Sequence, residues 1–196
     1  MKSNNIRNRR TNQRPLRTIA LLFLLIQLLH PSASHIFAAE SPYVTWGSAT
    51  PIVGFGISNE YGFEPNPVLL ESVVNYMADS RHVWTNSGAG VNASVPKTGN
   101  NMISIANKSE SWYGVCTRKW FFGYSYQIDI NYRTIKEGAQ QLLPFIRSVT
   151  VHELGHVFSL SDTPGTTASI MSYSRNRNSM TSPQSIDVTR VKNHYQ

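Results

Sequence analysis

The stretch from His152 to His156 reads His-Glu-Leu-Gly-His, and it constrains the fold more than any other part of the chain. On a helix, residues four apart lie on the same face, so both imidazoles can reach one metal ion. Zn²⁺ binds neutral imidazole nitrogen readily and keeps a position for water when the protein supplies three ligands. Glu153 is placed to take a proton from that water. The pattern therefore predicts a helix that carries a hydrolytic zinc site.

The sequence after this motif adds a turn-rich run and then Ser169-Ile-Met-Ser-Tyr173. Here the chain resembles the metzincin clan of zinc peptidases, whose signature continues with a glycine, a third ligand and a methionine turn. The resemblance implies that Asp162 is the third ligand and that Met171 is the methionine of the turn. It also implies that Tyr173 assists at the metal, as in the serralysin and astacin branches, with a core-filling aromatic residue as the alternative.

Two positions depart from the common signature. Ser159 stands where the clan has a glycine, which normally lets the helix end in a left-handed conformation. We therefore expect Ser159 to adopt that conformation with strain, or to form a different turn. An aspartate as third ligand is similar to the small snapalysin-type members. It adds negative charge at the metal and makes a bound water less acidic.

The downstream acidic residues are few enough to compare as third ligands. No glutamate follows Glu153, so Asp162 and Asp187 are the later carboxylates. Asp187 stands in an amphipathic stretch, where an acid near a helix start or a structural hydrogen bond explains it. His194 is expected at the surface. Asp162 is the preferred ligand, and a solvated turn residue is the alternative.

Residues 1–39 are predicted to be an export signal, and residues 40–196 a single domain. The segment has six basic and no acidic residues, an apolar run from Ile19 to Leu29, and small residues before Ala39. Cleavage near Ala38 or Ala39 is preferred over Ser34. The apolar run is short for a membrane span, so a retained anchor is the less favoured alternative.

The net charge of +7 arises mainly from this segment. Removing its six basic residues from the 18 Lys+Arg leaves 12 against 11 Asp+Glu, so no nucleic-acid partner is indicated. Cys116 is the only cysteine, so no intrachain disulfide can form, and a small buried residue is its simplest interpretation. An export signal without disulfides is typical of a secreted bacterial protein, here expected to be monomeric.

The remaining pattern predicts the α/β class, as an α+β zincin with a twisted mixed sheet of about five strands. Helices are expected from the Pro-rich cluster at Glu64–Pro67 to Trp84, over Leu142–Leu160 and over Ser185–Tyr195. Short alternating or aromatic-rich runs predict the strands Pro51–Ser58, Val91–Val95, Met102–Ala106, Trp112–Lys119 and Tyr124–Tyr132.

The expected function is zinc-dependent hydrolysis of peptide bonds, with Glu153 as general base. A single zinc is expected, because the loop Asn107–Ser111 lacks the histidines that hold a second one in matrixins. Calcium is left open, although no acidic loop for it is evident. The alternative function is an inactive zincin-fold protein that binds a partner at the cell surface. Arg175 and Arg177 either select acidic substrate residues or keep their loop soluble, and the second is favoured.

Overall fold

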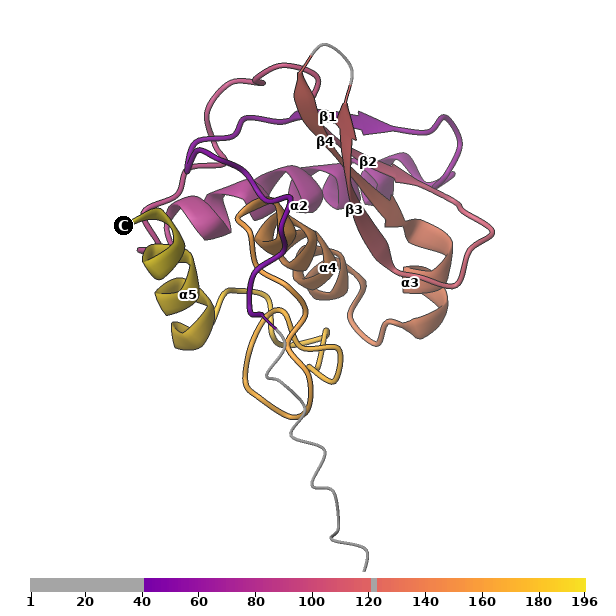
Figure 1. The fold of residues 1–196 in the computed structure, drawn as a ribbon. Helices are drawn as coiled ribbons and strands as arrows, with labels where there is room; N and C mark the ends of the chain where they lie inside the picture. The colour runs from indigo at the N-terminus through magenta and orange to yellow at the C-terminus, as the bar shows by residue number, and fades with distance from the viewer. Residues whose placement is uncertain (1–40, 121–122) are drawn as a thin grey trace, which may run out of the picture. The chain divides into compact units, whose positions relative to one another are not determined.

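Alternating apolar and polar residues in the two central strands produce a sheet that is buried on one face. The computed structural model describes residues 41–120 and 123–196 (Figure 1). In strands β2 (Met102–Ala106) and β4 (Tyr124–Asn131), successive side chains point to opposite faces. The polar Ser104 and Asp129 are hydrogen-bonded to each other on the less buried face. The fully buried side chains of the other face are Ile103, Ile105, Ile128 and Ile130.

The sheet is mixed, with the strand order β1-β2-β4-β3. Strand β1 (Gly56–Asn59) runs parallel to β2, and β2 runs parallel to β4. Strand β3 (Gly114–Trp120) pairs antiparallel with β4 and stands at one edge of the sheet. The mixed α/β architecture is therefore confirmed.

The expected fifth strand at Val91–Val95 is wrong. In this segment only Asn92 pairs with another strand-like residue, through an isolated bridge to Ile52. The side chain of Asn92 accepts a hydrogen bond from the backbone N–H of Ser94 at 2.9 Å. Such local side-chain bonds compete with a strand ladder, and the alternation of apolar residues does not reveal them.

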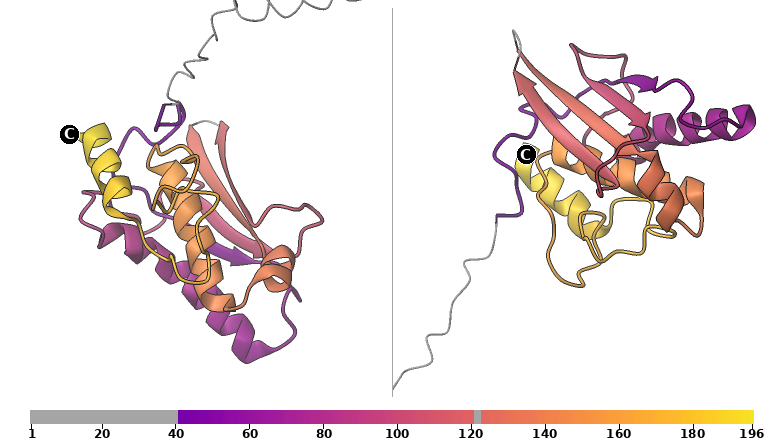
Figure 2. Two further views of the ribbon diagram at one scale, coloured as in Figure 1. Left: turned by 90° about the horizontal axis from the view of Figure 1, so that it is seen from below. Right: turned by 90° about the vertical axis from the view of Figure 1, so that its right-hand side faces the viewer.

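Helix α2 (Pro67–Thr85) begins within the predicted cluster because its first turn is well satisfied. The side chain of Asn66 accepts hydrogen bonds from the backbone N–H groups of Val68 and Leu69, and proline occupies the first helical position. Helices α2 and α4 (Leu142–Val157) pack together against the buried face of the sheet (Figure 2). Trp84 joins them, since its buried indole Nε1 donates to the carbonyl of Val151 at 2.8 Å.

The other two helices differ in how well the sequence revealed them. Helix α5 (Ser185–Tyr195) has its predicted bounds, whereas α4 ends at Val157 rather than at Leu160. Helix α3 (Tyr132–Gly138) is absent from the sequence-based expectations. It follows β4 directly, and the aromatic and β-branched run up to Tyr132 has the composition of a strand.

The predicted export signal and its cleavage site lie outside the described residues. The chain from Ser41 to Gln196 forms one compact unit. Within the described part of the chain, no helix combines the length and the apolar character needed to cross a membrane.

Candidate metal centre

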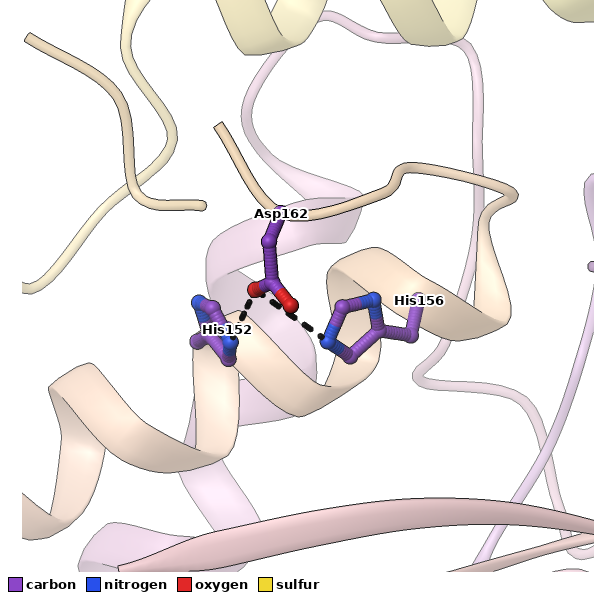
Figure 3. A group of neighbouring side chains, drawn as sticks. All are labelled: His152, His156 and Asp162. Carbon is purple, nitrogen blue, oxygen red and sulfur yellow. Dashed lines mark ion pairs between the residues drawn. The ribbon is translucent and has the colours of Figure 1, made fainter. Parts of the chain in front are cut away.

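Helix α4 carries both histidines of the motif on one face. The ring centroids of His152 and His156 are 4.9 Å apart, and the ring planes are nearly perpendicular. Both side chains are largely buried. Figure 3 shows the two rings beside one another on α4, each with a nitrogen turned toward Asp162.

The chain leaves α4 through a tight turn centred on Ser159. Its φ is 71°, the one positive value at a non-glycine residue in the described chain. Ser159 N–H donates to the carbonyl of His156 and Leu160 N–H to that of Gly155, both at 3.0 Å, which is the Schellman pattern. The left-handed conformation, expected to be strained, costs a residue with a side chain about 1–2 kcal/mol. This turn sends the chain back toward the histidines.

Asp162 follows this turn and lies beside both rings. Its Oδ1 is 3.2 Å from Nε2 of His152 and 3.8 Å from Nε2 of His156 (Figure 3). The three atoms lie within 4.8 Å of one another, and residues 41–120 and 123–196 contain one group of this kind. The side chain of Asp162 is 35% exposed, and its position beside both rings favours the ligand role over the alternative of a solvated turn residue.

In each histidine, the hydrogen bond formed by Nδ1 decides which ring nitrogen faces Asp162. Nδ1 of His152 lies 2.9 Å from the carbonyl of Ile170, and Nδ1 of His156 lies 2.8 Å from that of Leu160. A carbonyl oxygen only accepts, so each Nδ1 carries a proton, and in a neutral ring Nε2 then presents a lone pair. Burial lowers the pKa of His152 to about 4, which keeps this ring neutral.

Two imidazole nitrogens and one carboxylate oxygen therefore face one another. Oδ1 of Asp162 is buried and has no hydrogen-bond partner among the described residues. A buried acceptor in this state costs about 1–3 kcal/mol. A cation between the three atoms would satisfy all of them, so the donor set fits a metal ion.

Asp187, the other carboxylate considered as a ligand, lies outside this group. It is fully buried and accepts hydrogen bonds from the hydroxyl of Ser169 and from the backbone N–H of Ile170. The structural hydrogen bond considered for it is thus confirmed. His194 is exposed on α5, where its ring stacks against Tyr43.

Met171 packs against α4 between the two histidines. Its side chain is fully buried, and a Cβ added at Gly155 would collide with its Sδ. The two segments therefore approach as closely as a glycine permits. Together with the bond from His152 to Ile170, this packing ties the turn that carries Met171 to α4.

Glu153 shares a cavity of about 310 Å³ with Asp162 and Tyr173. Burial raises the pKa of its carboxyl group to about 8, and the charge of Asp162 adds to this effect. Strand β3 passes close by, since a Cβ on Gly114 would lie 2.9 Å from Oε1 of Glu153. Because Gly114 has no side chain, the carboxyl group of Glu153 fits beside it. This role of Gly114 is not evident from the sequence, because a glycine at the start of a strand carries no sign of what it approaches.

Tyr173 is 66% exposed, so the core-filling alternative is wrong. Its hydroxyl donates to Oδ2 of Asp162 at 2.8 Å, and this bond raises the pKa of Tyr173 to about 12. The phenol therefore keeps its proton at neutral pH. It is available as a hydrogen-bond donor at the mouth of the cavity.

Arg175 is buried, which corrects the expectation that it faces solvent. It is 7% exposed and donates to the hydroxyl and the carbonyl of Ser148 and to the carbonyl of Ser172. Ser148 lies on α4, one turn before His152. A polar loop sequence could not reveal this contact, because it depends on how the loop folds back onto the helix.

Comparison with known proteins assigns no family to this chain. No family model and no curated protein matches the sequence. Among solved structures, the chain is similar to one described as "GM1 bound form of the ECX AB5 holotoxin", with 11% sequence identity and a TM-score of 0.47. The similarity covers 74% of this chain and 80% of that chain. At this level it carries no argument about fold or function.

Proposed function

We propose that this protein is an exported, zinc-dependent endopeptidase of the metzincin type that acts on protein or peptide substrates. One observation carries the proposal. Two imidazole lone pairs and one carboxylate oxygen without a partner converge at His152, His156 and Asp162. The resemblance of the His-Glu-Leu-Gly-His motif and of the later methionine turn to that clan supports it.

Zinc suits this donor set better than a hard cation does. Tetrahedral ligands at about 2.0–2.1 Å from zinc lie roughly 3.3–3.4 Å apart. The contacts of Asp162 Oδ1 with the two histidines, 3.2 and 3.8 Å, bracket that spacing. Calcium takes about six to eight oxygen ligands, which two nitrogens and one carboxylate do not offer. One zinc ion per chain is proposed, with one ligand position left for water.

The cavity beside these residues supplies the other groups that peptide hydrolysis needs. When bound, zinc would act as a Lewis acid that makes water more acidic and a peptide carbonyl more electrophilic. The positive charge of bound zinc would lower the pKa of Glu153 from its value of about 8 and so favour the carboxylate form. In that form Glu153 would accept the proton of the attacking water and return it to the departing amine. Tyr173 exchanges its bond to Asp162 for one to the substrate carbonyl oxygen as negative charge develops there.

The edge strand offers a place for the substrate main chain. Residues Gly114–Cys116 of β3 line the same cavity as Glu153. An extended peptide can pair with an exposed strand edge through backbone hydrogen bonds. Such pairing suits unfolded chains and loops, which present an extended backbone.

Zinc content and peptide cleavage, measured together on the exported protein, test the proposal. We expect one zinc per chain by elemental analysis and cleavage of casein or of unstructured peptides. Glu153→Gln should keep zinc and lose about 10²–10⁴-fold in kcat, whereas Asp162→Ala should lose zinc.

Two results would contradict the proposal. A zinc-loaded wild type that cleaves no peptide would favour the alternative of an inactive binding protein. Undiminished activity in Glu153→Gln would show that another group is the base.

A further inference from the structure

A second cavity, of about 250 Å³, adjoins the candidate metal centre. It shares Gly114, His152, Glu153 and Tyr173 with the first cavity. The rest of its wall combines apolar side chains, among them Trp112 and Val149, with the guanidinium groups of two arginines. A chain segment that reaches Glu153 can therefore place a neighbouring group in this second cavity.

The buried arginine of this cavity, Arg175, forms no ion pair with a carboxylate in the described part of the chain. A guanidinium group carries five N–H donors. Three hydrogen bonds are formed, all to neutral oxygens of Ser148 and Ser172, which leaves two donors. Within the described residues no carboxylate forms an ion pair with Arg175. Burial, aided by the charge of Arg177, lowers the pKa of Arg175 to about 9, which reflects the cost of burying this charge.

Arg177 adds a second positive charge to the same wall. It is partly exposed, and its guanidinium group lies over the ring of Tyr113, 5.2 Å from the centroid. It has no ion pair with a described carboxylate either. Two cations line one small cavity, and burying such charges without a counter-ion is costly. Glu153 lines the same cavity, and its charge, like those of Asp162 and Asp187, favours the protonated guanidinium of Arg175. None of the three carboxylates forms an ion pair with either arginine, so the unused N–H donors can bind a carboxylate of a bound molecule.

We infer that this cavity binds a carboxylate group of the peptide substrate, next to the bond that is cleaved. The inference rests on the proposed peptidase function and adds a substrate preference to it. A guanidinium group recognises a carboxylate through two parallel N–H···O bonds. Trp112 and Val149 would contact the methylene groups of an acidic side chain. The carboxylate is supplied either by a glutamate or aspartate side chain or by the chain end of a short peptide.

Peptide binding to the zinc-loaded Glu153→Gln protein tests the inference without relying on turnover. Fluorescence anisotropy is measured with peptides that differ only by Glu or Gln at successive positions, each as free acid and as C-terminal amide. We expect at least one Glu peptide to bind about 10-fold more tightly than its Gln partner. If amidated Glu peptides bind more tightly than amidated Gln peptides, the cavity binds the side-chain carboxylate. If the free acid binds more tightly than the amide, the cavity binds the C-terminal carboxylate.

Variants of the arginines separate recognition from support of Glu153. Arg177→Gln removes one charge and leaves the buried hydrogen bonds of Arg175 in place, so the Glu preference should fall several-fold. Arg175→Lys keeps the charge but not the paired donors, and should weaken the preference further. Lys192→Gln is the matched control, since it removes one charge from the exposed surface of α5.

The outcomes keep this inference distinct from the proposed function. Cleavage by the wild type with no Glu preference in binding overturns the inference and leaves the peptidase proposal standing. A preference for Glu peptides in binding without any cleavage supports the inference and contradicts the peptidase proposal. If Arg177→Gln slows cleavage of Glu and Gln peptides equally and leaves both affinities unchanged, the arginines act on Glu153 instead, and the inference fails.

Discussion

The buried carboxylate of Asp187 accepts a hydrogen bond from the backbone N–H of Ile170, at 2.8 Å. The carbonyl of Ile170 in turn lies 2.9 Å from Nδ1 of His152. Asp187 belongs to the capping box of α5, where it also accepts from the backbone N–H of Gln184. The start of the last helix therefore holds the backbone that orients one histidine of the candidate metal centre.

Replacement of Asp187 by asparagine should weaken zinc binding without touching a ligand. The uncharged amide oxygen would accept the two backbone N–H groups of Ile170 and Gln184 more weakly than Oδ2 does, and the amide nitrogen cannot accept from the hydroxyl of Ser169. The backbone that orients His152 would therefore loosen. Loss of such an outer partner typically costs about 10–100-fold in metal affinity. Competition with a chromophoric chelator measures the zinc affinity. The control is Asp79→Asn at an exposed position on α2. A lower melting temperature with unchanged zinc affinity would show that Asp187 supports only the fold.

Ser159→Gly should stabilise the protein by about 1 kcal/mol. Glycine adopts the positive φ of this position without strain. The substitution also removes a buried hydroxyl oxygen that has no hydrogen-bond partner. These gains exceed the greater entropy of glycine in the unfolded chain. Urea unfolding measures the difference, with Ser159→Ala as the control that removes the hydroxyl and keeps the strain. A glycine variant less stable than the alanine variant would refute the strain at this turn.

Tyr173→Phe should separate catalysis from metal binding. The phenol donates to Oδ2 of Asp162, whereas Oδ1 faces the histidines, so zinc content should stay at the wild-type level. Removal of a donor to the developing oxyanion costs about 10²–10³-fold in kcat. Steady-state cleavage of one peptide, with zinc content measured on the same samples, tests this. Loss of zinc together with activity would show that Tyr173 mainly holds Asp162 in place.

Glu64 provides a pH-dependent contribution to stability far from the candidate site. Its carboxylate accepts hydrogen bonds from the hydroxyl of Tyr132, from the backbone N–H of Asn66 and from Lys136. These bonds, that of Tyr132 first, lower the pKa of Glu64 from 4.5 to about 2. A lowered pKa in the folded state means that the ionised form is stabilised. The stabilisation is complete above pH 4.5 and is lost as the pH falls toward 2.

Glu64→Gln should therefore cost on the order of 2 kcal/mol of unfolding free energy at pH 7. The difference from the wild type should shrink as the pH falls from 4.5 to 2, since both proteins then carry a neutral group. Urea unfolding across this range, with and without chelator, measures the difference between the two proteins. The exposed Glu137→Gln serves as control, because its pair with Arg133 is a surface pair. A difference independent of pH would rule out the ionised carboxylate as its source.

Local patterns predicted the parts of this protein that depend on local interactions. The four-residue spacing of His152 and His156 places both on one helix face. The Pro-rich start of α2 and the bounds of α5 follow from capping residues. By contrast, α3 was missed and a strand at Val91–Val95 was wrongly expected. Aromatic and β-branched residues allow more than one conformation, and neighbouring polar side chains decide between them.

The sequence by itself determined which groups are present for a metal site and how two of them are spaced, because helical periodicity is a property of neighbouring residues. The resemblance to the metzincin signature also implied that Asp162 is a ligand, and the local turn at Ser159 brings it back toward the histidines. The tertiary structure alone decided that Asp187 holds Ile170. It also decided that Gly114 makes room for Glu153 and that Arg175 is buried beside the site. Each of these depends on contacts between segments distant in the chain. Such contacts are set by packing, and no local pattern records them.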